Sequence, residues 1–247
     1  MTHSLRFFLP AFLTAIMLTT LLGLGFWQVE RLTWKKALLA RIAERQSAAP
    51  VSLYTASDIK ALSRARDDYA PAILHGRYGR EQLFWFTQIE NKPDGLAGRD
   101  RAGYHVLVPF ILRDGTALLL DRGFVPARLK DTPDANPKGE TALQVVLRWP
   151  DTRGRFDNAD KPEAGLVYVR SPAAIGPYWQ KQLPSVIAES AEIGKHWPRG
   201  GQTRMNIKNN HLQYAGTWFG LAIVLVIISG LWHIRLWKNR HAGDEKR

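Results

Sequence analysis

The chain has 247 residues, with 34 lysines and arginines against 22 acidic side chains and a formal net charge of +12. It contains no cysteine, which excludes disulfides, thiolate metal sites and cysteine nucleophiles. The positive charge suits nucleic acid, an anionic membrane surface or an acidic partner. Because both signs are interleaved and no zinc finger, RNP motif or arginine-rich helix occurs, we expect no nucleic-acid binding.

The first apolar stretch carries no charged residue from Phe7 to Val29. It is longer than the apolar core of a secretory signal peptide and lacks a small-residue cleavage site. We therefore predict that residues 7–29 form an uncleaved membrane-spanning helix. A helical pattern with leucines on one face continues beyond it. We expect an amphipathic stalk over residues 30–47, which ends before Pro50.

Residues 50–208 contain short alternating runs separated by glycine and proline, which predict one mostly β domain. Arg113-Asp114-Gly115 is typical of a hairpin turn between two of the runs. A further short strand is expected at residues 167–169 and a short helix within residues 173–183. The main predicted strands are residues 72–78, 82–89, 103–112, 117–124 and 141–148.

The second apolar stretch has no charged residue from Asn209 to Ile234. We predict a second transmembrane helix at residues 212–234, followed by a basic cytoplasmic tail at residues 235–247. Two crossings place both termini on one side of the membrane and the central domain on the other. The predicted fold class is thus an α+β membrane protein, with two terminal transmembrane helices flanking one mostly β extracytoplasmic domain. Basic residues flank both ends of both spans, so charge only weakly favours this orientation.

The start of the second span carries polar side chains that a plain membrane anchor does not need. At helical spacing, His211, Tyr214 and Trp218 share one face. A neutral imidazole is a good axial ligand for heme iron. An interfacial histidine that caps the helix and binds lipid headgroups explains the same residue. Gly216 and Gly220 form a small-x-x-x-small pair, which permits close helix packing but is equally common as plain composition of a membrane span.

The end of the first span carries a matching set of residues, Trp27, Gln28 and Arg31, with Lys35 one turn further on. If the two spans pair, both polar ends meet at the outer membrane boundary. Arg31 or Lys35 could then bind an anionic group such as a heme propionate. The alternative is that these cations extend towards lipid headgroups.

The central domain contains no recognisable enzyme motif. Asp121-Arg122-Gly123 is best explained as a structural ion pair followed by a glycine at a backbone bend. His75, His105 and His196 are scattered without metal-ligand spacing, and no phosphate loop, carboxylate dyad or Ser-His-Asp arrangement is evident.

Several motifs, taken in order, resemble the Surfeit locus protein 1 family, the Shy-type assembly factors of cytochrome c oxidase biogenesis. The resemblance covers nearly the whole chain, and the block that begins at Asn209 is its most specific part. The matching motifs are Gly25-Phe26-Trp27-Gln28-Val29-Glu30-Arg31-Leu32 with Trp34-Lys35, Gly76-Arg77-Tyr78, Gly103-Tyr104-His105-Val106, Leu120-Asp121-Arg122-Gly123-Phe124-Val125-Pro126, and Asn209-Asn210-His211-Leu212-Gln213-Tyr214-Ala215 with Thr217-Trp218-Phe219-Gly220.

The resemblance implies a periplasmic or intermembrane-space domain held by two helices, and a role in maturing the catalytic subunit of heme–copper oxidases. It implies transient binding of heme a, with His211 at the position of the family's heme-linked histidine. Arg122 and Gly123 match its Arg-Gly block, a structural or partner-binding element. The short segment before the first span leaves no room for a transit peptide, which favours a bacterial inner membrane.

The leading hypothesis is a non-enzymatic assembly factor that holds heme a between the spans and assists its insertion into the catalytic subunit of cytochrome c oxidase. His211 would be the axial ligand, with Trp27, Gln28, Tyr214 and Trp218 around the ring and Arg31 or Lys35 at the propionates. Heme a synthase, copper chaperones and the lipid bilayer are further candidate partners. One alternative is a heme-independent scaffold that grips the oxidase through the β domain. Another is a membrane-bound enzyme or sensor, which predicts a polar pocket with convergent titratable groups.

Overall fold

The computed structural model describes residues 2–88, 102–131, 136–150, 153–155, 158–194, 196–201 and 210–244. The chain divides into two compact units. One consists of Met1–Ala40 and Ile207–Arg247, and the other of Arg41–Asn206. Two terminal helices flanking a β-rich central domain confirm the predicted fold class.

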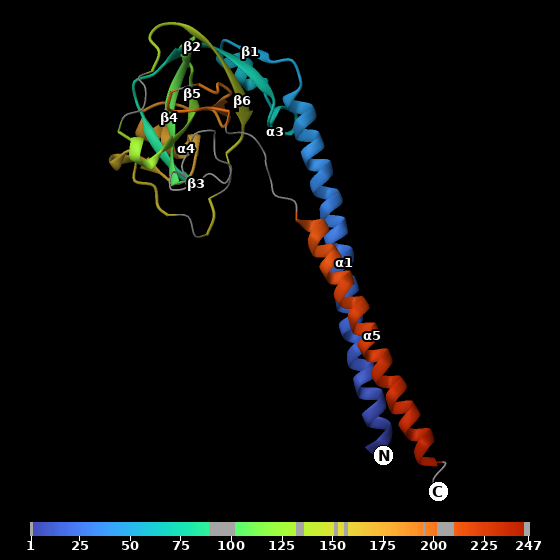
Figure 1. Ribbon diagram of the computed structural model, residues 1–247. Helices are drawn as coiled ribbons and strands as arrows, with labels where there is room; N and C mark the ends of the chain where they lie inside the picture. Colours follow the sequence, from blue (N-terminus) through green and yellow to red (C-terminus); the bar gives the residue numbers. More distant parts are fainter. Residues whose placement is uncertain are drawn as a thin grey trace. The chain divides into compact units, whose positions relative to one another are not determined.

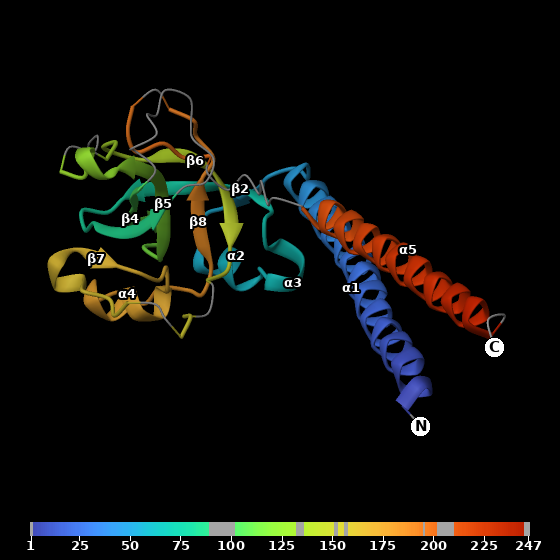
Figure 2. The same ribbon diagram turned by 60° about the horizontal axis from the view of Figure 1, so that its bottom comes forward.

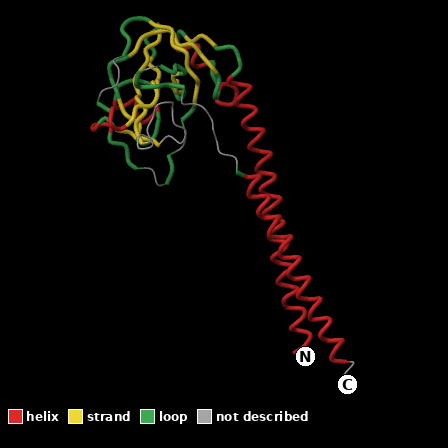
Figure 3. Tube along the Cα trace, in the orientation of Figure 1, coloured by secondary structure: helices red, strands yellow, loops and turns green. Residues whose placement is uncertain are grey.

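The first unit is built from α1 (Thr2–Gln46) and α5 (His211–Asp244), the two long helices in Figure 3. Both are long and apolar enough to cross a membrane, over Phe8–Gln46 and His211–Lys238, with mean hydropathies of 1.9 and 2.0. The α1 helix continues without a break beyond its apolar part and ends four residues before Pro50. Proline disfavours a helical conformation at the residue before it, which accounts for this end.

The two helices pack side by side and run in opposite directions (Figures 1 and 2). Near the start of α5, an added Cβ at Gly25 would lie only 2.6 Å from the Phe219 ring. Near the other end of the pair, Ser229 Oγ donates a hydrogen bond to Thr14 Oγ1 at 3.2 Å. Small residues and hydroxyl groups are common at such contacts, because in lipid the helices associate by close packing and interhelical hydrogen bonds.

The predicted packing role of Gly216 and Gly220 is wrong. Both are exposed, and a Cβ added at either would meet nothing within 4 Å. Ala215 and Ala222 are buried instead, each only 3% exposed. The face of α5 that contacts α1 is therefore the one that carries Ala215 and Ala222. The glycine that lies close to the other helix is Gly25 of α1.

The second unit is a closed barrel with added strands. The strand order is β1-β2-β6-β8-β5-β4-β3-β7, and an additional pairing of β2 with β4 closes a ring of β2, β6, β8, β5 and β4. Closure leaves these five strands without a free edge. The strands are β1 (Val51–Leu53), β2 (Pro71–Tyr78), β3 (Leu83–Gln88), β4 (Ala102–Leu112), β5 (Ala117–Pro126), β6 (Thr141–Arg148), β7 (Leu166–Val167) and β8 (Ile187–Ser190).

Short helices complete the second unit: α2 (Ala56–Lys60), α3 (Arg64–Asp67), α4 (Pro172–Tyr178), and the 3-10 helices η2 (Ala127–Leu129) and η3 (Pro162–Ala164). The five main predicted strands are confirmed as β2 to β6, although Ile89 lies outside the described residues. The short helix is confirmed as α4, whereas the short strand, β7, shares only Val167 with the predicted residues 167–169. The predicted hairpin turn joins β4 to β5, with Gly115 at a φ of +87°.

The barrel core explains why β4 and β5 read as nearly continuous apolar runs. One face of each strand points into the barrel, with Val106, Phe110 and Leu118 fully buried. Leu107 and Leu119 belong to a second cluster that includes Ile175 and Trp179 of α4. Both faces of these strands are therefore covered, and α4 lies next to β7 in Figure 2. Successive side chains of a strand point to opposite faces, and here both faces are buried. Both sets of side chains are therefore mostly apolar.

Candidate functional site

The polar start of α5 contacts the matching end of the apolar part of α1. His211 is the first residue of α5, and its Nδ1 lies 2.7 Å from Oε1 of Gln28. Gln28 is only 9% exposed. The amide oxygen can only accept, so Nδ1 of His211 carries the hydrogen and donates it. Nε2 then has a free lone pair, and it makes no hydrogen bond within the described part of the chain.

This arrangement is chemically suited to binding a metal ion in a cofactor. Histidines that ligate metals commonly donate the hydrogen of their other ring nitrogen to an oxygen acceptor, which fixes the tautomer and the ring orientation. Gln28 supplies such an acceptor, and His211 is half-buried at the helix end. The donor set therefore fits an axial ligand of heme iron through Nε2.

The helix pair has two flanks, and the predicted site residues gather on one of them. The edge-to-face contact of Phe26 with Phe219, at 5.5 Å between ring centroids, marks one flank. The hydrogen bond between Gln28 and His211 marks the other. With about 100° of rotation per residue, Tyr214 and Trp218 lie on the flank of His211, and Arg31 and Lys35 on the flank of Gln28.

Along the helix axes, the cationic residues lie on one side of His211 and the aromatic residues on the other. Arg31 and Lys35 lie about one and two turns beyond Gln28, past the start of α5. Trp218 lies about 10 Å from His211 in the opposite direction, towards the apolar centre of α5. The guanidinium carbon of Arg31 is 4.0 Å from the centroid of the Trp34 ring, and Arg31 is exposed. The flank is thus cationic at one end and aromatic at the other.

Two predicted ring contacts are more exposed than expected. Tyr214 is 54% exposed and Trp27 is 53% exposed. Tyr214 still belongs to the flank of His211, and Trp27, four residues before Arg31, lies on the same side of α1 as Arg31. Direct contact joins Gln28 and His211, whereas Arg31, Trp27, Tyr214 and Trp218 lie on neighbouring parts of the same flank by helical spacing.

A second constellation lies in the barrel, and the sequence did not predict it. His105 Nδ1 is 2.9 Å from both carboxylate oxygens of Asp121. Arg170 Nη1 donates to Asp121 at 2.8 Å and to Glu189 at 2.6 Å. The backbone N–H of Gly123 adds a bond to Asp121 at 2.9 Å. We call His105, Asp121, Arg170 and Glu189 the barrel charge cluster.

The charges in this cluster stabilise one another. Burial by itself would raise the pKa of Asp121, but His105, Arg170 and the Gly123 N–H outweigh burial and lower it to about 2. Burial would lower the pKa of Arg170, but Glu189 and Asp121 together raise it. The cluster therefore holds an ionised carboxylate that is 1% exposed beside a guanidinium that keeps its charge.

The cluster continues along the outer face of the sheet, on the side of Leu119 and Ile187, to Arg148 of β6. Arg148 Nη1 lies 3.8 Å from Glu189 Oε1, and Arg148 Nε lies 3.2 Å from Asp68 Oδ1. Asp121 takes its partners from other strands and loops rather than from the adjacent Arg122, so the ion pair expected from the sequence is wrong. Neighbouring residues on a strand point to opposite faces, which separates these two side chains.

Arg122 and Gly123 have distinct roles in β5. The Arg122 guanidinium lies 5.7 Å from the centroid of the Tyr78 ring. Gly123 has a φ of +115°, and an added Cβ would lie 2.1 Å from the carbonyl oxygen of Arg199. Phe124 and Arg199 exchange two backbone hydrogen bonds of 2.9 Å at this place. The predicted backbone role of Gly123 is confirmed.

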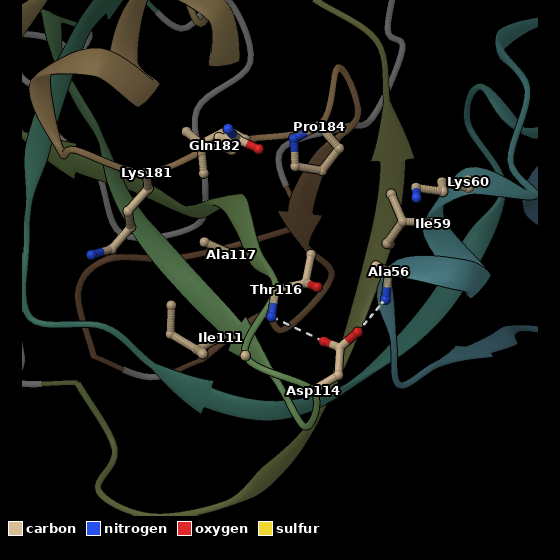
Figure 4. Close-up of a pocket in the computed structure, with 12 residues that line it drawn as sticks. Ala56, Ile59, Lys60, Ile111, Asp114, Thr116, Ala117, Lys181, Gln182 and Pro184 are labelled. Carbon is tan, nitrogen blue, oxygen red and sulfur yellow. Dashed lines mark hydrogen bonds between the residues drawn. The ribbon is translucent and has the colours of Figure 1, made fainter.

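A groove of about 720 Å³ opens beside the β4–β5 hairpin (Figure 4). Its Asp114 accepts hydrogen bonds from the backbone N–H groups of Ala56 and Thr116, at 2.6 and 2.9 Å. The lining residues are Ala56, Ile59, Lys60, Ile111, Asp114, Gly115, Thr116, Ala117, Lys181, Gln182, Leu183 and Pro184. None of them belongs to the barrel charge cluster, whose titratable groups face one another.

These features define a class of protein: a β barrel carried by two helices able to span a membrane, with a histidine at the mouth of the helix pair. The model of the SURF1 family matches residues 15–223, and the chain therefore belongs to the SURF1 family. The predicted resemblance is confirmed. The matched range includes His211 and Gln28 and the whole barrel.

Individual relatives support the same assignment. Surfeit locus protein 1 of Homo sapiens is 32% identical over 216 residues, covering 82% of this chain and 70% of that protein. The protein of the same name from Mus musculus is 31% identical over 226 residues, covering 87% and 72%. That from Xenopus tropicalis is 30% identical over 213 residues, covering 81% and 67%.

Proposed function

We propose that this SURF1 family member is an assembly factor for a cytochrome c oxidase, and that it binds heme a as cargo and assists its insertion into the catalytic subunit. The hydrogen bond between His211 Nδ1 and Gln28 Oε1 carries the proposal. It holds the imidazole in the tautomer whose Nε2 can ligate iron. Family membership and the order of the site motifs support the oxidase as the destination.

The residues around His211 suit an amphipathic macrocycle. Trp218 and Tyr214, on the same flank, offer aromatic surface for a flat apolar ring. Arg31 and Lys35, at the other end of the flank, offer positive charge for carboxylate groups such as propionates. Bound heme would offer its iron to His211 and its flat ring to the aromatic side chains. It would take part in no reaction here, because the proposed task of the protein is to hold and release it.

Delivery requires that the cargo can leave. The proposed ligand residue lies at a helix end rather than in a closed cavity, and Tyr214 is more than half exposed. A lateral site of this kind favours exchange over permanent retention. We further propose a two-pass arrangement in a bacterial inner membrane with the barrel on the periplasmic side, where the oxidase subunit would meet it. Heme a synthase and copper chaperones remain further candidate partners.

The test is the heme a content of the purified full-length chain after co-expression with heme a synthesis. His211→Ala is the test variant, and His233→Ala, which changes another histidine of α5, is the matched control. The proposal expects bound heme a in the wild type and in His233→Ala, and little in His211→Ala. Equal occupancy in all three proteins would refute His211 as the ligand.

Oxidase assembly in cells separates the cargo function from a scaffold function. Membranes that lack the chain should contain less oxidase activity and less heme a. If His211→Ala restores both fully while Arg122→Ala does not, the heme-independent scaffold is the correct function. Arg122 suits this comparison because its guanidinium lies near the ring of the partly buried Tyr78 rather than in the barrel charge cluster.

A further inference from the structure

The hydrogen bond at the mouth of the helix pair joins two different helices. The ligand nitrogen belongs to α5, whereas the oxygen that orients it belongs to α1. Gln28 is buried between the helices, so its amide faces α5 rather than the open flank. This position suits an orienting group and leaves little of the amide free for direct contact with cargo.

The helix packing beside this bond is unusually close. Gly25 lies three residues from Gln28, one turn along the same face of α1. A Cβ at Gly25 would lie 2.6 Å from the Phe219 ring, so any larger residue must displace that ring from its place against α1. Ala215, one turn after His211, is 3% exposed and allows the same close approach. Small residues on both helices, Gly25 and Ala215, therefore lie within one turn of the bond between Gln28 and His211 and leave room for it.

We propose that Gln28 is a positioning residue that fixes the Nδ1–H tautomer of His211, and that it couples cargo binding to the pairing of α1 with α5. The inference rests on the proposed function for the identity of the cargo. A separated helix pair would leave the imidazole free to rotate and to adopt the other tautomer. The ligand site is thus complete only when the helices are paired.

The coupling has a reciprocal consequence. If pairing raises the affinity for heme, heme must favour pairing by the same factor. Loosening of the helix pair near Gly25 would then lower the affinity and release the cargo without any change in the ligand itself. Separation of the helices would thus give the assembly factor a means of releasing heme.

The first measurement tests the positioning role without heme. Nitrogen-15 NMR of histidine-labelled apoprotein in detergent reports which ring nitrogen of His211 is protonated, with His211→Ala to assign the signal. The wild type should show hydrogen on Nδ1. Gln28→Leu should show a mixture or the opposite tautomer, and Gln28→Glu should keep hydrogen on Nδ1. An unchanged tautomer in Gln28→Leu would overturn the inference.

The second measurement is heme affinity. Loss of an outer-shell partner typically lowers metal affinity by about 10- to 100-fold, and we expect that range for Gln28→Leu. Gly25→Leu should weaken binding similarly, although it changes neither histidine nor glutamine. Gly216→Leu is the matched control, because that glycine has nothing within 4 Å and should tolerate the change. Unchanged affinity in both Gln28→Leu and Gly25→Leu would contradict the coupling.

The third measurement reports helix pairing. The chain has no cysteine, so Thr14→Cys combined with Ser229→Cys introduces one thiol pair at the other end of the helices, where the wild-type hydroxyls are 3.2 Å apart. Heme should increase crosslinking in this background but not when Gln28→Leu is added. If the wild type binds no heme at all, the proposed function fails, whereas the NMR result still decides the positioning role.

Discussion

Asp121 is the carboxylate whose removal tests the barrel charge cluster most severely. It is 1% exposed and takes bonds from His105, Arg170 and the Gly123 backbone. Asp121→Asn keeps the size of the side chain but removes its charge. Breaking a buried pair by removing one partner costs about 3–5 kcal/mol, because the other charge is left uncompensated. We expect a loss of stability of that size near neutral pH.

The pH dependence of stability gives a second, independent estimate of how much the ionised Asp121 stabilises the fold. The pKa of Asp121 is lowered from 3.8 to about 2 in the folded chain. A carboxylate with a lowered pKa stabilises the fold above its unfolded pKa, and this contribution is lost as the pH falls through the folded pKa. At 1.36 kcal/mol per unit of pKa, the shift corresponds to about 2 kcal/mol. The stability difference between wild type and Asp121→Asn should shrink by about that amount between pH 4 and pH 2.

Urea unfolding of the full-length chain in detergent, followed by tryptophan fluorescence, measures both effects. Trp85 is a local reporter, because its ring centroid lies 4.2 Å from the Arg170 guanidinium and 5.0 Å from the His105 ring. Glu163→Gln is the control, since Glu163 is exposed and has no partner within the described residues. Equal stability of wild type and Asp121→Asn at pH 7, with parallel curves down to pH 2, would refute the reasoning.

Three further predictions concern the barrel and its orientation. Gly123→Ala should lower the unfolding temperature far more than Gly115→Ala, because both glycines have positive φ but only Gly123 lacks space for a Cβ. Differential scanning calorimetry would show equal shifts if backbone conformation alone mattered. Arg122→Ala should cost about 1–2 kcal/mol of stability, the range of a cation–π contact between half-buried partners, and urea unfolding checks this; a loss as large as that of Asp121→Asn would contradict it. In cells, cysteines introduced separately at Gly115 and Gly243 should react with a membrane-impermeant maleimide only at Gly115, and labelling at Gly243 instead would reverse the proposed orientation.

Most of the fold could be predicted because its signals are local. The uncharged runs before Glu30 and before Arg235 mark the two long helices, and Asp114-Gly115 marks a hairpin. The sequence predicted neither β1 nor β8, and β8 shows why a strand without a local pattern is missed. Glu189 and Ser190 are buried at 7% and 6% exposure, so this strand lacks the apolar alternation of an ordinary one. Its polar residues are stabilised by partners that only the barrel brings together.

The two sites differ in how much the sequence could predict. His211 and Gln28 each stood in a polar segment at a span end, and pairing of the spans was enough to bring them together. The barrel charge cluster depends on the parallel pairing of β5 with β8, which no local pattern indicates. One usable signal existed, because Asp121 directly follows an apolar run and Gly123 fixes the backbone beyond it. A buried carboxylate in such a strand needs partners.

The sequence also did not show which face of each long helix contacts the other helix. Gly216 and Gly220 carry the spacing of a packing motif, yet they point away from α1, while Gly25 contacts Phe219. A spacing motif defines a face of one helix but not which face the partner chooses. The contacts of Gln28 with His211 and of Gly25 with Phe219 are what decide it here.

The most direct test of the account is the ratio of heme a to protein in the purified full-length chain, measured by pyridine hemochrome spectra after co-expression with heme a synthesis. We predict heme a in the wild type and in His233→Ala, a reduced amount in Gln28→Leu, and almost none in His211→Ala. Heme a bound equally by His211→Ala, or by none of the four proteins, would contradict the central claim that the mouth of the helix pair carries heme.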